Sequence, residues 1–194
     1  MMTSTDALPS PRWQPLTGGT AVWVFMTVEL VTFGMFLLGH AWGWRSEPEA
    51  YVQGQALLHP ASGLRGTVLL LLGSGLAYQG VLAFEQGQRR ASAAWLLSAA
   101  AAGLAFAVNK GVEYADPALA EVTLSTSTFW FGYLFLTGLH LLHVLGGVAA
   151  LPWLAWQVGR GRAEALTVQA GAAYWHLVDV IWVLLFPILY LMQP

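Results

Sequence analysis

Five long apolar segments, separated by short polar stretches, dominate this chain of 194 residues. Each segment is close to the roughly 20 residues that an α-helix needs to cross the hydrocarbon core of a bilayer. Such a segment must be helical, because in lipid only a helix pairs its own backbone N–H and C=O groups. The predicted spans cover about residues 21–42, 65–84, 92–112, 128–156 and 171–191.

The shortage of charged side chains supports the same fold class. Only 9% of the residues are charged and 57% are hydrophobic, whereas about a quarter of a soluble domain is charged. The net charge of −2, with no basic tract, argues against a nucleic-acid partner. Cysteine is absent, which excludes disulfides, iron–sulfur clusters and thiolate metal sites. The sequence therefore predicts an all-α, polytopic membrane bundle of five transmembrane helices.

The basic residues between the spans predict how the bundle is oriented. Residues 1–19 are polar and contain three prolines, so we expect a flexible cytoplasmic tail before a transmembrane domain over 20–194. Loops rich in Lys and Arg stay in the cytoplasm. With the amino terminus inside, five arginines share that side: Arg12, Arg89, Arg90, Arg160 and Arg162. We therefore predict a cytoplasmic amino terminus and an external carboxyl terminus.

Small residues in the third predicted span indicate a face of close helix contact. Ala99, Gly103 and Ala107 follow one another at intervals of four residues. They therefore line one face of the helix and allow a neighbouring helix to approach closely.

Ionisable residues inside the spans are the candidate functional residues, because each costs about 2.5 to 3.5 kcal/mol at the bilayer centre. Glu29 lies near the middle of the first span. It is either an acid that exchanges protons or contacts lipid headgroups, or a neutral acid bonded to a neighbouring helix. Lys110 and Glu113 close the third span on one helix face, where they form an ion pair or the lysine extends to the interface.

The last two spans carry histidine at a repeated spacing. His140 and His143 lie three residues apart, about 60° around the helix, so one site can receive both. His176 and Asp179 repeat this spacing in the last span. Such residues from facing helices can ligate a metal, and two histidines can ligate haem iron. Alternatively, they form interhelical hydrogen bonds that fix the packing. The spacing leaves both interpretations open.

The motifs around these residues resemble subunit III of the haem–copper oxidases. Residues 174–182, Y-W-H-L-V-D-V-I-W, are similar to the family signature Y-W-H-F-V-D-V-V-W, and residues 137–147 are similar to its T-G-x-H-x-x-H-V-x-x-G stretch. Glu113 and Tyr114 match the E-Y pair that closes the preceding helix. Glu29 matches the family's carbodiimide-reactive membrane glutamate. The resemblance extends from about residue 20 to residue 191.

This resemblance implies a subunit without redox groups, since haem and copper lie in the partner subunits I and II. It implies packing against the catalytic subunit I, with subunit II as a further candidate partner, in the bacterial inner (plasma) membrane. It also implies phospholipid binding and support of assembly, proton uptake and durable turnover in aerobic respiration. Long members of the family have seven spans and this chain lacks the first two, so it resembles the short five-span bacterial form.

On this basis we expect no catalytic, cofactor-binding or metal-binding residues in the chain. We expect instead an intramembrane polar network that orients the helices and contacts lipid, in which Asp179 holds His176 by accepting a ring N–H. Its predicted members are Glu29, Glu113, His140, His143, His176 and Asp179.

Three other functions fit the sequence less closely. An accessory protein of a nitric oxide reductase belongs to the same family and serves a different reaction. A membrane haem or metal protein with its own redox site would use the histidines as ligands. A small transporter is the weakest alternative, because the sequence shows no discontinuous helix pair and no inverted repeat.

Overall fold

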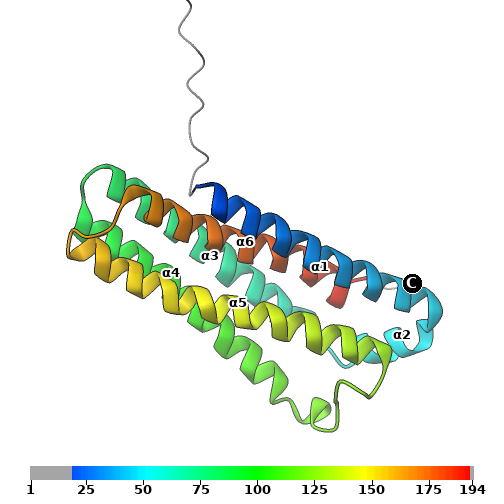
Figure 1. Cartoon of the computed structure of the whole chain (residues 1–194). Helices are drawn as coiled ribbons and strands as arrows, with labels where there is room; N and C mark the ends of the chain where they lie inside the picture. The colour runs from blue at the N-terminus through cyan, green and yellow to red at the C-terminus, as the bar shows by residue number, and fades with distance from the viewer. Residues whose placement is uncertain (1–18, 193–194) are drawn as a thin grey trace, which may run out of the picture.

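Five of the helices in this chain are long and apolar enough to cross a membrane, which confirms the predicted number of spans. The computed structural model describes residues 19–192, so the predicted tail lies outside the described residues except for Gly19. The spans are α1 (Thr20–Ser46), α3 (Pro60–Glu85), α4 (Arg89–Tyr114), α5 (Thr128–Gly159) and α6 (Ala165–Tyr190) (Figure 1). Each helix is longer than its predicted span, because polar first and last turns continue the apolar segment.

Two short elements were not predicted from the apolar pattern. Helix α2 (Pro48–Ala56) follows α1 directly, and the 3₁₀ turn η1 (Pro117–Leu119) follows α4. Proline stands at the start of both, where its missing N–H is not needed and its fixed φ suits a helix. Neither element is long enough to span a bilayer, and both lie at the same end of the bundle (Figure 1).

Helix α6 is the most buried of the five spans. It packs against α1, α3 and α5, and α4 lies between α3 and α5. Helix α1 is the least buried of the five spans, because it contacts the others along one side only. The remaining four spans therefore form the core of the bundle, and α1 lies at its edge.

Close approach of α4, α5 and α6 depends on glycine. The Trp175 side chain of α6 is fully buried. A Cβ atom added at Gly103 of α4 or at Gly147 of α5 would overlap its indole ring. The expectation that Gly103 lies on a face of close helix contact is confirmed, and Ala99 on the same face is fully buried.

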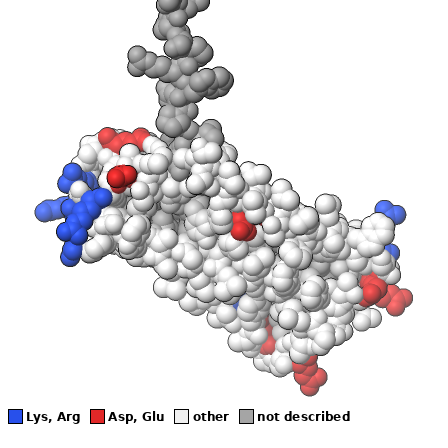
Figure 2. Space-filling view, in the orientation of Figure 1, with Lys and Arg blue, Asp and Glu red and all other residues white. Residues whose placement is uncertain are grey.

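Charged residues gather mainly at the two ends of the bundle, and an acidic patch interrupts the otherwise apolar middle of the visible face (Figure 2). Basic side chains crowd the end that carries the turns between α3 and α4 and between α5 and α6. The opposite end carries α2, η1 and most of the acidic residues. Such a distribution is expected of a bundle whose middle lies in hydrocarbon and whose ends lie in water.

Candidate functional site

The ionisable side chains within the spans fall into separate groups when their hydrogen bonds and ion pairs are followed. One group surrounds Lys110 and Glu113, and a second joins Glu29 to His143. A third joins His176 to Asp179. Five of the six predicted members of one network are therefore distributed over three places in the bundle, and each place connects a different set of helices.

The first group, here called the sealed cluster, consists of Lys110, Glu113, Ser62, Tyr133 and Tyr190. Lys110 Nζ lies 3.4 Å from Glu113 Oε2, and their side chains are 1% and 3% exposed. Lys110 Nζ also donates hydrogen bonds to the hydroxyl oxygens of Tyr133 (2.9 Å) and Tyr190 (2.6 Å). The lysine is therefore enclosed by protein and does not extend to the interface, so the ion-pair interpretation is the correct one.

The carboxylate of Glu113 accepts hydrogen bonds from three hydroxyl groups. The Tyr133 and Tyr190 hydroxyls donate to Oε1 at 2.7 Å and 2.6 Å, and the Ser62 hydroxyl donates to Oε2 at 2.8 Å. These groups come from α3, α5 and α6, while Lys110 and Glu113 come from α4. Buried charges are tolerated when they are paired and fully hydrogen-bonded. The sealed cluster therefore joins four helices through one ion pair.

Aromatic rings complete the enclosure of the lysine. Its Nζ lies 4.7 Å from the centroid of the Tyr133 ring, 5.1 Å from that of Tyr114 and 5.5 Å from that of Trp182. Cations at this distance are attracted by the ring face. Sequence analysis did not single out Tyr133 or Tyr190, because tyrosine near the end of a span is typical of the membrane interface.

The second group joins the edge helix α1 to α5. Glu29 Oε2 lies 3.2 Å from His143 Nε2, and the two side chains are 18% and 17% exposed. His143 Nδ1 lies 2.8 Å from the Leu139 carbonyl, which can only accept, so Nδ1 carries a proton. His143 Nε2 is therefore the ring nitrogen that faces the Glu29 carboxyl group. The Tyr174 hydroxyl donates to the His143 carbonyl at 2.8 Å and ties α6 to the same place.

The third group, here called the open cluster, consists of Ser74, His176 and Asp179. His176 Nδ1 lies 3.6 Å from Asp179 Oδ2, and the Ser74 hydroxyl makes a short contact with the same nitrogen. A separation of 3.6 Å is longer than a hydrogen bond, so Ser74 takes the bond that was expected for Asp179. The His176 side chain is 51% exposed, and Asp179 Oδ1 is buried with no hydrogen-bond partner among residues 19–192.

His140 stands outside these groups. It is fully buried, and neither ring nitrogen has a hydrogen-bond partner in the described part of the chain. Its ring packs against Phe106 of α4 and Trp182 of α6, at centroid distances of 5.5 Å and 5.1 Å. His140 therefore contacts α4 and α6, whereas His143 contacts α1. The two histidines do not face one common site. Over residues 19–192 no group of three or more His, Cys, Asp or Glu residues is placed to hold a metal ion.

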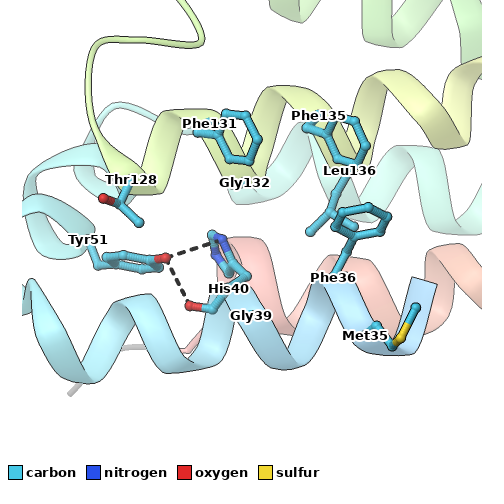
Figure 3. A pocket seen from close by; sticks show the side chains of 10 residues that line it. All are labelled: Met35, Phe36, Gly39, His40, Tyr51, Thr128, Phe131, Gly132, Phe135 and Leu136. Atoms are coloured by element: carbon cyan, nitrogen blue, oxygen red, sulfur yellow. Dashed lines mark hydrogen bonds between the residues drawn. The ribbon is translucent and has the colours of Figure 1, made fainter. Parts of the chain in front are cut away.

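Sequence analysis also did not single out His40, near the carboxyl end of α1. The Tyr51 hydroxyl of α2 donates to the His40 carbonyl at 2.8 Å and lies 3.4 Å from its Nδ1 (Figure 3). Beside this pair, α1 and α5 enclose an apolar cavity of about 280 Å³ that Phe36 and Phe135 help to line. Burial, together with the nearby carboxylate of Glu47, raises the pKa of Tyr51 to about 12. Tyr51 therefore remains a hydrogen-bond donor at neutral pH.

Comparison with known protein families identifies the family to which these motifs belong. The family model "Cytochrome c oxidase subunit III" matches residues 21–193 and so includes all five spans. The chain belongs to the cytochrome c oxidase subunit III family. The resemblance seen in the sequence motifs is confirmed.

Individual relatives from bacteria and archaea support this assignment. The chain is 28% identical over 177 residues to a cytochrome c oxidase subunit 3 of Corynebacterium diphtheriae, covering 88% of this chain and 85% of the relative. It is 31% identical over 130 residues to that of Synechocystis, covering 65% and 54%. It is 29% identical over 182 residues to a heme-copper oxidase subunit I+III of Aeropyrum pernix, covering 89% of this chain and only 22% of that longer protein.

Proposed function

We propose that this chain is the non-redox subunit III of a haem–copper terminal oxidase in aerobic respiration and packs against the catalytic subunit I. The observation that carries the proposal is the family match over residues 21–193, which includes each of the motifs with intramembrane ionisable residues. The subunit I+III of Aeropyrum pernix supports the partner, because in that protein the two subunits belong to one chain.

The orientation and the membrane are part of this proposal. Arginines at the turns after α3 and α5 gather at one end of the bundle (Figure 2). The positive-inside rule then favours a cytoplasmic position for that end and for the start of α1. The membrane that fits is the inner (plasma) membrane of a bacterium.

The proposed contributions of the chain are assembly, phospholipid binding and support of proton uptake. Helix α1 supports lipid contact, since it is the least buried span and exposes large apolar residues such as Val24, Leu38 and Trp42. The Glu29–His143 pair supports a role near a proton path, because it places a carboxyl group 3.2 Å from an imidazole within the spans. Haem and copper are expected in the partner subunits.

Purification of the tagged chain from native membranes tests the proposal. We expect a haem-containing catalytic subunit to co-purify, and the isolated chain to show no Soret band and no stoichiometric metal. Co-purification with a nitric oxide reductase instead of an oxidase would identify the rival accessory function. A Soret band or bound copper in the isolated chain, or elution with no partner at all, would overturn the proposal.

A further inference from the structure

The open cluster differs from the other intramembrane groups in its exposure. His176 lies near the middle of α6 (Ala165–Tyr190), so it lies at the depth of the bilayer centre. Its side chain is 51% exposed, compared with 18% for Glu29 and 1% for Lys110. A polar ring exposed at this depth would face hydrocarbon unless another molecule covers it.

The surface around His176 is a groove along α6. Helices α1 and α3 both pack against α6. His176 lines two hollows beside these contacts. One hollow, of about 430 Å³, lies between α1, α3 and α6 and includes Met26 and Tyr78. The other, of about 480 Å³, lies between α3 and α6 and includes Leu71 and Val180. The walls are apolar and the polar groups of the open cluster lie where the two hollows meet.

His176 shows what an occupant must provide. Its side chain is 51% exposed and lines both hollows, whereas Asp179 Oδ1 is covered by this chain and is out of reach of an incoming group. A lipid tail has no polar group, and lipid headgroups lie about 15 Å away from the bilayer centre, half of its hydrocarbon thickness. The occupant must therefore carry a hydrogen-bonding group at mid-membrane depth, as a spanning helix with a polar side chain does.

We infer that the groove along α6 is the surface that receives a transmembrane helix of the catalytic subunit. The helix presents apolar side chains to Leu71 and Val180 and a hydrogen-bonding group, such as a hydroxyl or an amide, to the exposed ring of His176. This inference rests on the proposed function for the identity of the partner. The sealed cluster and the Glu29–His143 pair need no such partner, because groups within the chain already satisfy their charges.

Site-specific photo-crosslinking in native membranes tests this surface. A benzophenone side chain placed at Val180, which is 48% exposed, lies in the groove. The matched control is Leu104 of α4, which is 52% exposed on a helix that contributes nothing to the groove. We expect a covalent product with the catalytic subunit from Val180 and not from Leu104. We also expect His176→Phe to reduce co-purification about tenfold, as the loss of one polar contact implies, with an unchanged melting temperature of the isolated subunit.

Each other outcome overturns the inference. Products from Val180 that contain only lipid or a second copy of this chain would show that the groove receives something else. A product from Leu104 but not from Val180 would leave the proposed function intact and place the interface on another face. Absence of the catalytic subunit from the purified complex would overturn the proposed function as well.

A second inference arises from a separate observation near the junction of α1, α2 and α6. Three buried polar atoms without a hydrogen-bond partner in residues 19–192 are His40 Nε2, Trp44 Nε1 and Gln55 Oε1. The three side chains line one small cavity of about 10 Å³. This is about the volume that holds a single water molecule, and such a molecule needs two to four polar partners.

We infer that this cavity binds one ordered water molecule that joins α1 to α2. The indole N–H of Trp44 donates to the water, and the water donates to Gln55 Oε1 and to His40 Nε2. The other hydrogen bonds of Gln55 and His40 are consistent with these donor and acceptor assignments. Gln55 Nε2 already donates to the Leu189 carbonyl of α6 at 3.2 Å, which leaves Oε1 as its free acceptor. The Tyr51 hydroxyl donates to the His40 carbonyl, so its oxygen is free to accept from Nδ1–H, and Nε2 is then an acceptor.

A high-resolution density map of the purified complex tests the water site. We expect one isolated peak within hydrogen-bond distance of all three atoms, and we expect its loss in Gln55→Leu. Trp44→Phe removes the donor and is expected to weaken the same peak. A map that shows other buried waters but no peak here, or direct bonds among the three side chains, would overturn the inference.

Discussion

The sealed cluster and the open cluster use similar side chains in opposite surroundings. Lys110 and Glu113 are enclosed by the tyrosines of two other helices, and the Glu113 carboxylate accepts three hydroxyl donors. The open cluster has one hydroxyl, Ser74, for two ionisable residues, and His176 is half exposed. Burial therefore separates two uses of polar residues in a membrane. Enclosed groups that the chain satisfies by itself join its helices, whereas the half-exposed His176 is the group that the inferred partner helix would contact.

The largest effect is expected from breaking the sealed cluster on one side. Lys110→Met leaves the buried Glu113 carboxylate without its cation, which costs about 3 to 5 kcal/mol of folding free energy. Thermal unfolding of the purified subunit in nanodiscs measures this loss. The double variant Lys110→Met/Glu113→Gln removes both charges and is expected to recover most of it. A single variant as stable as the unmodified chain would contradict the structural role of the pair.

Breaking the open cluster is expected to affect association more than folding. Asp179→Ala removes the carboxylate beside the His176 ring that the partner helix is expected to contact, at a cost of about 1 to 3 kcal/mol. The measurement is the amount of catalytic subunit that co-purifies, with the haem content of that subunit as a control that stays unchanged. Normal assembly together with an unchanged melting profile would show that Asp179 has no structural role.

The Glu29–His143 pair is intermediate between these two clusters, because its side chains are partly exposed but paired with each other. Glu29→Gln retains a hydrogen-bonding group beside the histidine and removes the carboxyl group. We expect the free energy of unfolding to fall by only about 1 kcal/mol. Thr27→Val, an exposed position two residues earlier on α1, is the matched control and is expected to have no effect. A loss as large as that of Lys110→Met would mean that this pair also holds the core together.

The smallest effect on stability is expected for the His59–Asp116 pair, which lies outside the spans. His59 Nε2 lies 3.1 Å from Asp116 Oδ2 between the loop before α3 and the loop after α4. The backbone N–H of Ala118, with His59 nearby, lowers the pKa of Asp116 below its ordinary value of 3.8. Its contribution is therefore complete above pH 3.8 and is lost as the pH falls through the lowered pKa.

Between about pH 8 and pH 9, above the ordinary histidine pKa of about 6.5, Asp116→Asn should thus shift the melting temperature by a constant and small amount. Melting curves at several pH values measure it. A difference between the two proteins that grows within this range would contradict the assignment of the effect to Asp116.

The sequence predicted the number of spans, the helical class and the family. These are local properties, because the length of an apolar segment and the need to pair backbone groups in lipid do not depend on the other helices. The motifs around Glu113, His143 and His176 were likewise visible as short stretches. Helix α2 was not predicted, because Pro48–Ala56 is short and carries little apolar pattern.

Only the tertiary structure decided which polar groups meet. The Tyr190 hydroxyl reaches a carboxylate 77 residues earlier in the chain, and Ser74 reaches a histidine 102 residues later. Such pairings depend on how each helix is rotated and which neighbour it meets, which spacing within one helix does not encode. For the same reason, the sequence placed six ionisable residues in one network, and the packing of the helices divided them between a closed interior, a helix edge and an open groove.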